Sequence, residues 1–324
     1  MSASDYNRMR LLNQVLTLYY VSELTQAEVG RRLGISTTTV NRLLQQAREQ
    51  GMVEITIRTP FHYLFDLESR LKAGFGISDA VVIPQVAEGA NAMVHTLGRA
   101  GAGYLTNRLR HGDVLAIGGG TAVHAIAEAL EVRDPVAVQV VPCIGAVQGR
   151  VTTDVNYLAS QLAARLGGEA YQLHAPAFVD SAAQREALLS MRPIKEILDI
   201  ARQATVALLG VGTVDAQASR FVQFTALSEE DMAWIAESCG GVGEIAARVF
   251  NSQGQPCAEE YAGRTVGLDL RELQQIPFTI GVAVTEAKAL PIYGALRGGY
   301  LDALITDEAA ARGILHLLEQ ESQT

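Results

Sequence analysis

The sequence predicts an α/β protein with a small, all-α helix-turn-helix domain in front of a larger, mostly parallel α/β domain. Two observations carry this prediction. In residues 1–60 apolar side chains recur at three- and four-residue spacing, as on amphipathic helices. Beyond residue 79, short runs of consecutive apolar residues alternate with helical stretches, as in a parallel sheet that is buried on both faces. We expect a helix-turn-helix domain over residues 1–59, a linker helix over 60–72 and the larger α/β domain over 73–324.

The composition is that of a globular protein with a sizeable core. Of the 324 residues, 48% are hydrophobic and 19% are charged. The apolar runs are far shorter than the roughly 18 residues that cross a bilayer, and the polar N-terminus lacks the apolar segment of an export signal. The three cysteines, Cys143, Cys239 and Cys257, have neither metal-ligand spacing nor a disulfide framework. We expect a cytoplasmic protein without a metal, a cofactor or a membrane partner.

The charge is unevenly distributed along the chain. Residues 1–60 contain seven arginines and five acidic residues, a net charge of +2, whereas residues 61–324 carry −11 of the total of −9. An acidic surface repels the phosphate backbone of nucleic acids. If the protein binds DNA, it therefore does so through the N-terminal domain alone.

Three helices are predicted in the N-terminal domain. The apolar stripe of the first comprises Met9, Leu12, Val15, Leu16, Tyr19 and Tyr20. The second begins at Thr25, where Thr25 and Glu28 form a capping box, and ends at Gly34. Ser36 can cap the third after a tight turn, and the inward face of that helix comprises Val40, Leu43, Leu44 and Ala47.

The outward face of the third helix has the chemistry of base recognition. Arginine can bind guanine with both arms, asparagine and glutamine can bind adenine, and a helix-turn-helix presents the N-terminal end of its second helix to the bases. A solvated helix face is the alternative, but two capped helices with a glycine turn accompany this one, and its first acidic residue is Glu49 at the far end. The residues that we assign to DNA binding are Gln26, Ser36, Thr37, Thr38, Asn41, Arg42 and Gln45. Residues 52–59 then predict a short strand, which could be a wing.

Seven apolar, β-rich runs in the second domain predict strands at residues 80–83, 113–118, 136–145, 205–212, 265–270, 278–284 and 302–306. Helices are predicted over 92–110, 122–130, 156–166 and 287–296. Ligands of such sheets bind beyond the carboxyl ends of the strands, where loops lead into helices. Three of these loops are candidate ligand sites.

The first candidate loop comprises Gly118, Gly119, Gly120 and Thr121. It ends a strand and begins a helix, so its N–H groups and the helix dipole can hold a phosphate or another anion. Glycines also serve simply to form tight strand–helix turns. The loop is neither a dinucleotide-binding fingerprint nor a Walker loop, which disfavours nucleotide hydrolysis.

The other two candidate loops follow later strands. Gly145 ends the turn 142–145, in which Cys143 is better explained as a small buried residue than as a nucleophile. Lys288 lies in the first turn of a predicted helix, where its charge opposes the helix dipole unless an anion binds nearby. The alternative is an ordinary surface lysine.

Several segments, in order along nearly the whole chain, resemble the SorC-type sugar-responsive bacterial transcription regulators. The segment TQAEVGRRLGISTTTVNRLLQQAREQGMVEITI (25–57) resembles the helix-turn-helix of that family. In the second domain, LAIGGGTAV and VVPCIGA resemble its Gly-x-x-Trp-Gly-Arg/Thr loop and its Val-Pro-x-x-Gly-Gly turn. Further matches are VNYLASQLAARLGG, LLGVGT, GGVGEIAARVFNSQG and GVAVTEAKALPIYGALRGGYLDALITDEAAA.

The resemblance implies a winged helix-turn-helix and an effector domain with the fold of glucosamine-6-phosphate deaminase and ribose-5-phosphate isomerase. It also implies a homo-oligomer, a dimer or more commonly a homotetramer, that is not an enzyme but regulates carbohydrate genes. The phosphate of a sugar-phosphate effector would lie among residues 118–121 and Lys288, and the sugar towards Gly145, Asn156 and Asp307. Because one small DNA-binding domain buries too little DNA for tight binding, we expect paired domains on an operator that is an inexact palindrome.

The sequence departs from the family pattern at three positions. Gly119 stands where the family usually has Trp, Ala146 replaces the second Gly of the Pro turn, and Thr37 replaces the common Arg after Ser36. The first two departures bear on the ligand and the third bears on the operator sequence.

The alternative function is an enzyme of the sugar-phosphate isomerase or deaminase fold with an appended DNA-binding domain. Such chemistry needs a positioned acid–base pair. The isolated candidates Asp154, Asp180, Asp215, Asp307 and His174 form no tight group in the sequence. An architectural nucleic-acid-binding protein is disfavoured by the acidic second domain.

Overall fold

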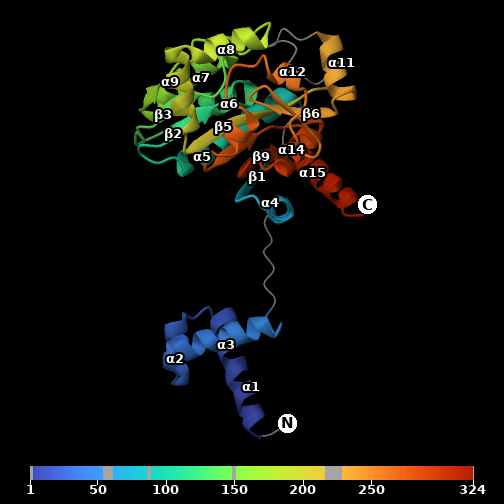
Figure 1. Cartoon of the computed structure of the whole chain (residues 1–324). Coiled ribbons are helices and arrows are strands. Elements are labelled where there is room, and N and C mark those ends of the chain that lie inside the picture. The colour runs from blue at the N-terminus through green and yellow to red at the C-terminus, as the bar shows by residue number, and fades with distance from the viewer. Residues whose placement is uncertain (1–2, 54–60, 86–88, 148–150, 216–227, 324) are drawn as a thin grey trace. The chain divides into compact units, whose positions relative to one another are not determined.

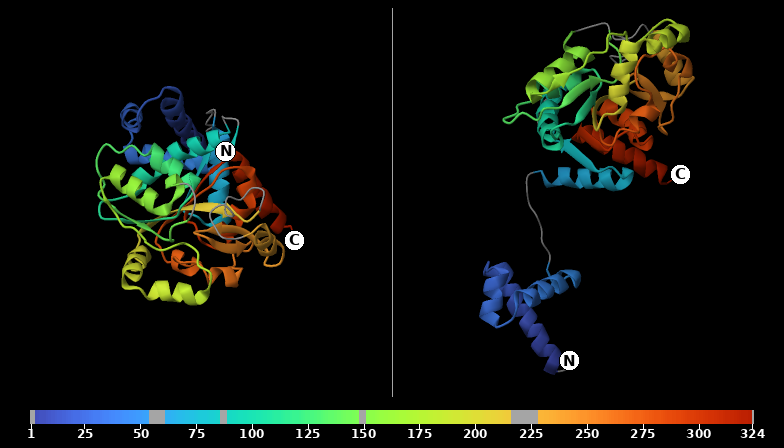
Figure 2. Two further views of the ribbon diagram at one scale, coloured as in Figure 1. Left: turned by 90° about the horizontal axis from the view of Figure 1, so that it is seen from above. Right: turned by 60° about the vertical axis from the view of Figure 1, so that its left-hand side comes forward.

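The computed structural model describes residues 3–53, 61–85, 89–147, 151–215 and 228–323. The chain divides into two compact units, the head unit, Met1–His62, and the body unit, Tyr63–Thr324 (Figures 1 and 2). Each unit has its own hydrophobic core. Among the described residues, none of the helices combines the length and apolar character that a bilayer-spanning segment requires.

The head unit is a helix-turn-helix. Its described elements are α1 (Ala3–Leu16), the π-helical turn η1 (Thr17–Val21), α2 (Gln26–Leu33) and α3 (Thr37–Glu49). The predicted inward face of α3 packs with Leu12, Val15 and Val29 in the core of the unit. The capping box of Thr25 and Glu28 starts α2, and Gly34, with a φ of 68°, ends it. These predictions are confirmed.

One member of the predicted apolar stripe of α1 lies outside the core. Met9 is 41% exposed, whereas Leu12, one turn later, is buried. Figure 1 shows the N-terminal part of α1 extending past α2 and α3. The predicted strand 52–59 is not assessed, because residues 54–60 lie outside the described residues.

The helix that was predicted as a linker is α4 (His62–Phe75), and it packs into the core of the body unit. Its buried residues are Leu64, Leu67 and Leu71. The Glu68 carboxylate accepts a hydrogen bond from the Val82 N–H at 2.9 Å. These contacts make α4 part of the body.

The described part of the body contains a nine-stranded, mostly parallel sheet, as predicted. Its parallel strands are β1 (Asp79–Ile83), β2 (Val114–Ile117), β3 (Gln139–Pro142), β4 (Glu169–Ala170), β5 (Val206–Thr213), β8 (Thr279–Val282) and β9 (Ala303–Asp307). They lie in the order β1-β9-β8-β5-β2-β3-β4. A hairpin of β6 (Gly241–Ile245) and β7 (Arg248–Asn251) pairs antiparallel with β5.

Helices cover both faces of this sheet (Figures 1 and 2). The connections through α5 (Ala90–Arg108), α6 (Thr121–Ala129) and α7 (Val155–Leu166) run in one direction along the strand order. Those through α9 (Arg192–Arg202) and α14 (Ala289–Arg297) run in the other direction. Because such crossovers are right-handed, the two groups lie on opposite faces. The C-terminal helix α15 (Glu308–Glu321) packs beside α14.

The structure corrects the predicted strand at 265–270. Thr265 and Gly267 form only isolated bridges, to Phe178 and Ile144, and α13 (Leu270–Leu273) begins after Asp269. The reason is that this segment crosses between two loops of the body and pairs with both, outside the main sheet. The elements that sequence periodicity did not predict are β4, β6, β7, α8 (Ala182–Ser190), α9, α11 (Glu229–Glu237), α12 (Glu259–Ala262), α13, α15 and the short helices η2 (Val151–Thr153) and η3 (Glu286–Lys288).

Candidate functional site

A pocket of about 330 Å³ opens at the carboxyl ends of the central strands of the body. Its lining comes from residues 118–122 after β2, residues 144, 145 and 147 after β3, residues 210–213 in β5, and the β6–β7 hairpin. The end of β8 and the loop after it add residues 282–285 and 288, and further lining residues come from α5, η2, α7 and Phe178. The pocket lies beside β2. From β2 the chain continues to β3 on one side in the sheet, whereas β5, the neighbour of β2 on the other side, leads towards β8. This reversal of direction is where open α/β sheets bind ligands.

The loop 118–121 presents the N-terminal end of α6 to the pocket. Two of its N–H groups are used inside the protein, since Gly118 donates to the Leu208 carbonyl at 3.1 Å and Gly120 donates to the Thr153 carbonyl at 3.2 Å. The prediction that the whole loop offers bare N–H groups is therefore wrong for these two glycines. Within the described part of the chain no side chain caps α6, and the first turn of a helix leaves its N–H groups without intrahelical partners. The His124 N–H already donates to the Gly120 carbonyl, so the candidate anion donors are the N–H groups of Thr121, Ala122 and Val123.

Close backbone contacts favour glycine at two positions of the pocket. A Cβ atom on Gly145 would lie 2.5 Å from the Pro176 carbonyl oxygen, and one on Gly119 would lie 3.0 Å from the Thr153 carbonyl oxygen. The Gly145 N–H donates to the Val266 carbonyl at 3.0 Å. The loop after β3 is therefore held against residues 175–176 and 266, and it cannot accept a side chain at position 145 without moving.

Among the described lining residues, Glu244 is the one that carries a carboxylate, and it was not among the residues predicted from the sequence. It stands in β6 opposite Gly212 of β5, and a Cβ atom at Gly212 would collide with its side chain. One carboxylate oxygen accepts the Ala247 N–H at 2.8 Å. Burial raises the pKa of Glu244, while the Ala247 N–H and the Lys288 charge oppose that rise. An acidic residue between apolar neighbours in the run Gly-Val-Gly-Glu-Ile was the available signal.

Lys288 and the loop that carries it close the pocket after β8. Lys288 is half-buried at the end of η3, and its charge acts on Glu244. Thr285, which begins the loop, lines the pocket in a left-handed backbone conformation with a φ of 90°. Among the lining residues that the structure describes, Lys288 and Glu244 are the two that carry charge. The pocket therefore combines a cation, a carboxylate and a helix N-terminus.

The structure brings six of the eight predicted effector residues together in this pocket, namely Gly118, Gly119, Gly120, Thr121, Gly145 and Lys288. Asn156 and Asp307 lie outside the lining. The Asn156 side chain binds the backbone of Leu173 through both its amide oxygen and its amide nitrogen. Asp307 is 1% exposed and accepts hydrogen bonds from the N–H groups of Thr285, at 2.9 Å, and Ala310. Both side chains are thus occupied in holding backbone.

A buried arginine braces the wall behind Gly145. Arg248 in β7 is 4% exposed and donates to the carbonyl oxygens of Ala262, Thr265, Gly267 and Leu268 at 2.7 to 3.2 Å. Burial lowers the pKa of its guanidinium group to about 10. The segment 265–268 pairs in turn with residues 143–145 and with Ala177. The hairpin that presents Glu244 therefore also fixes the opposite loop.

In the head unit, six of the seven predicted DNA-binding residues lie on α3 or at its N-cap. Ser36, Thr37, Thr38, Asn41, Arg42 and Gln45 are exposed, and Gln26, at the start of α2, is half-buried. Ser36 caps α3 by accepting the Thr39 N–H at 3.1 Å. The Gln45 amide donates to Glu49 at 3.0 Å. Since Val40, Leu43 and Leu44 fill the core, the polar side chains project from the opposite face of the helix.

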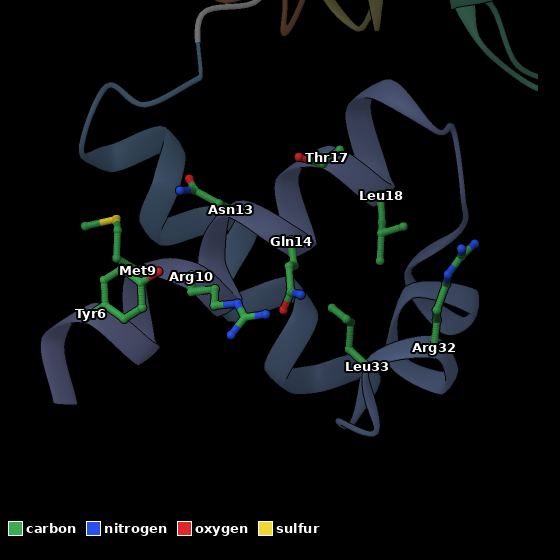
Figure 3. Close-up of a pocket in the computed structure, with 9 residues that line it drawn as sticks. All are labelled: Tyr6, Met9, Arg10, Asn13, Gln14, Thr17, Leu18, Arg32 and Leu33. Carbon is green, nitrogen blue, oxygen red and sulfur yellow. The ribbon is translucent and has the colours of Figure 1, made fainter. Parts of the chain in front are cut away.

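The head unit also has a wide groove of about 660 Å³ between α1 and α2. Figure 3 shows Gln14, Leu18 and Leu33 pointing into this groove, with Tyr6 and Met9 beside it. Its charged lining residues are Arg10 and Arg32. None of the predicted DNA-binding residues lines it.

Comparison with known proteins gives a family match in each unit. A family described as "Putative sugar-binding domain" matches residues 59–316, and the family of region 4 of sigma-70 matches residues 11–50. The deoxyribonucleoside regulator of Bacillus subtilis is 32% identical over 318 residues, which is 96% of this chain and 99% of that protein.

Solved structures agree with these matches. The full-length sorbitol operon regulator SorC from Klebsiella pneumoniae has a TM-score of 0.73 at 31% identity, over 95% of this chain and 99% of that one. The sugar-binding domain of a transcriptional repressor from Vibrio fischeri has a TM-score of 0.73 at 30% identity, over 79% of this chain and 99% of that one. The chain therefore belongs to the SorC-type family of sugar-binding transcriptional regulators.

Proposed function

We propose that the body pocket binds a phosphorylated sugar and that its occupancy controls how the head units bind an operator. The observation that carries this proposal is the convergence of the α6 N-terminus and Lys288 on one pocket at the switch point of the sheet. Both groups stabilise a dianionic phosphate. The regulators of sorbitol and deoxyribonucleoside genes that this chain resembles support a carbohydrate ligand.

The phosphate must find its attraction locally. Residues 61–324 carry a net charge of −11, so the long-range field of the body opposes an anion. The N–H groups of Thr121, Ala122 and Val123 and the Lys288 ammonium group supply the local attraction. Glu244 would then accept hydrogen bonds from the hydroxyl groups of the sugar. An ionised carboxylate accepts hydrogen bonds, and a sugar hydroxyl group is an uncharged donor. This division assigns the phosphate to the α6 side of the pocket and the hydroxyl groups to the hairpin side.

The test is titration calorimetry with aldose, ketose and polyol phosphates, each beside its unphosphorylated parent. We expect at least one phosphate ester to bind, and its parent to bind at least about tenfold more weakly, a difference of about 1.4 kcal/mol. Lys288→Ala should weaken the ester by a similar factor and leave the DNA affinity of the ligand-free protein nearly unchanged. Lys195→Ala is the matched control, because Lys195 is exposed on α9, away from the pocket. Equal affinity for ester and parent would contradict the phosphate assignment.

The assignment of the α3 face to base reading and of the body to assembly belongs to the same proposal. We propose a cytoplasmic homo-oligomer, a dimer or a tetramer, that pairs its head units on an inexact palindrome. A ligand that draws the α6 loop and the η3 loop together would change how the subunits pair. The coupling free energy between effector binding and DNA binding in such a switch is about 1–3 kcal/mol. Sedimentation of the full chain as a monomer at micromolar concentration would count against this part of the proposal.

A sugar-phosphate isomerase or deaminase is the second candidate function, because Glu244 and Lys288 are an acid–base pair facing a ligand-sized pocket. We favour a regulator without enzymatic activity, since the relatives are transcriptional regulators. No second acid–base pair comes from the other acids and the histidine that the sequence offered, because none of them lines the pocket: Asp154, Asp180, Asp215, Asp307 and His174. Recovery of unchanged ester after prolonged incubation with the protein is the expected result. Catalytic conversion that Glu244→Gln abolishes would establish the enzyme instead.

A further inference from the structure

Backbone strain in the body unit is concentrated at the pocket. Among the described residues of the body, those other than glycine with a positive φ are Ala137, Ala246, Ala247, Ala258 and Thr285. Three of them, Ala246, Ala247 and Thr285, line the pocket. Positions of this kind persist only where the surrounding structure enforces them, and they cluster where ligands are held.

Thr285 is the most strained of the three. Its φ of 90° and ψ of 148° lie in a region that glycine occupies freely and that a side chain branched at Cβ strongly disfavours. The two alanines have a φ of 47° and 59°, close to the ordinary left-handed region, and they form the two-residue turn of the β6–β7 hairpin. Glycine would be the expected residue at position 285 if the backbone alone mattered.

A buried carboxylate holds Thr285 in this conformation. The Thr285 N–H donates to Asp307 Oδ1 at 2.9 Å, and the same oxygen accepts the Ala310 N–H at the start of α15. Asp307 ends β9, the strand next to β8, and is 1% exposed. The backbone at 285 is therefore tied to a rigid neighbouring element, while the residue itself remains half-buried at the pocket. Three residues later the same loop carries Lys288.

We infer that Thr285 is a specificity-determining residue of the effector pocket, kept as threonine at a cost in stability because its hydroxyl group binds an oxygen of the ligand, with Asp307 as its positioning residue. This inference rests on the proposed function. A hydroxyl group both donates and accepts, so it can bind a sugar hydroxyl or a phosphate oxygen beside Lys288. If Thr285 served only the fold, glycine at position 285 would raise the stability of the body and leave the affinity for the ligand unchanged.

The test compares three substitutions in the full chain. Thr285→Gly relieves the strain and removes the hydroxyl group, whereas Thr285→Val retains the branched shape and removes the hydroxyl group alone. Ala137→Gly is the matched control, since Ala137 has a φ of 48° and does not line the pocket. Melting temperature without ligand and affinity for the tightest phosphate ester of the calorimetric panel are measured for each.

We expect Thr285→Gly to raise the melting temperature of the body by about 2 °C or more and to weaken the ester at least about fivefold. Thr285→Val should weaken the ester similarly without raising the melting temperature, and Ala137→Gly should leave the affinity unchanged. A lower melting temperature for Thr285→Gly, or wild-type affinity in both Thr285 variants, would overturn the inference. If wild-type protein binds no member of the panel, the proposed function fails first, and the inference fails with it.

Discussion

The head and body units build their recognition surfaces in opposite ways. The head places its predicted base-reading residues on one helix, α3, within ten consecutive positions. The body draws its pocket from segments between residues 94 and 288 that meet only because the strands of the sheet end side by side. The α3 face points outward and requires little beyond a stable helix. The pocket requires loops to be braced against one another.

This difference teaches where substitutions will act. If the α3 face binds DNA as proposed, a change on it should remove one contact with DNA and leave the fold of the head intact, because the core residues lie on the other side of the helix. A change in the pocket is transmitted through shared partners. Arg248, for example, connects the hairpin of Glu244 to the wall behind Gly145. Effects should be additive in the head and coupled in the body.

The largest effect is expected on the stability of the body when the hydrogen bonds of Arg248 are removed. Arg248→Met removes four hydrogen bonds inside the body. Arg185 and the Thr265 N–H still bind the carbonyl oxygens of Thr265 and Ala262, but those of Gly267 and Leu268 lose the arginine donor, so the body should be destabilised by about 3 kcal/mol. The transition of the head in differential scanning calorimetry should remain in place. The control is Arg133→Met, at an exposed position of the body, which should change neither transition. If the head transition moved as far as that of the body, the two units would not be independent.

The next effect concerns base reading. Arg42→Ala should cost about 1–3 kcal/mol of operator affinity and relax specificity at one position of the site. Thr37→Ala, at a position expected to contact the DNA backbone, should weaken all sequences more evenly. Fluorescence anisotropy with an operator selected from random DNA, and with single-base variants of it, measures both. Retained affinity and selectivity in Arg42→Ala would remove α3 as the reading element.

A smaller effect compares the same helix cap in the two units. Ser36 caps α3 in the head, and Ser181 caps α8 in the body, each accepting an N–H from three residues later. Alanine at either position should cost about 1 kcal/mol. Because the shift in melting temperature per kcal/mol falls with domain size, Ser36→Ala should lower the melting temperature of the head more than Ser181→Ala lowers that of the body. Equal shifts would show that the head does not unfold by itself.

The smallest effect expected near neutral pH is that acidification changes the stability of the head and that of the body in opposite directions. Hydrogen bonds with Thr25 lower the pKa of Glu28 below 4.5, so its contribution to head stability is present above pH 4.5 and is lost as the pH falls through the folded value. Burial raises the pKa of Glu244 above 4.5. Its protonation therefore favours the folded body, and that contribution is lost as the pH rises from 4.5 through the folded value.

Calorimetry between neutral pH and pH 4 checks this contrast. Moderate acidification should raise the stability of the body relative to that of a Glu244→Gln variant before the head begins to lose stability. Glu28→Gln should reduce the loss of stability of the head at acidic pH and leave the pH dependence of the body unchanged. A body whose pH dependence is the same with and without Glu244 would show that this carboxylate is not the group that titrates.

Local chemistry determined much of this protein from the sequence alone. The caps at Thr25 and Ser36, the glycine end of α2 and the inward face of α3 depend on neighbours within four residues, and all were predictable. The central strands were predictable because strands buried on both faces are apolar throughout. The glycine loop 118–121 and Lys288 could be named because ligand loops of such sheets follow the strands.

Only the tertiary structure decided which of these groups meet. Glu244 joins the pocket through a hairpin added to β5, and no periodicity in the sequence marks that pairing. Asp307 lies behind the pocket rather than in it, because its carboxylate is used by the N–H groups of Thr285 and Ala310. Segment 265–270 is apolar enough for a strand, but it pairs with two loops and Arg248 instead. Long-range pairing depends on partners far along the chain, and local spacing does not encode which partner is chosen.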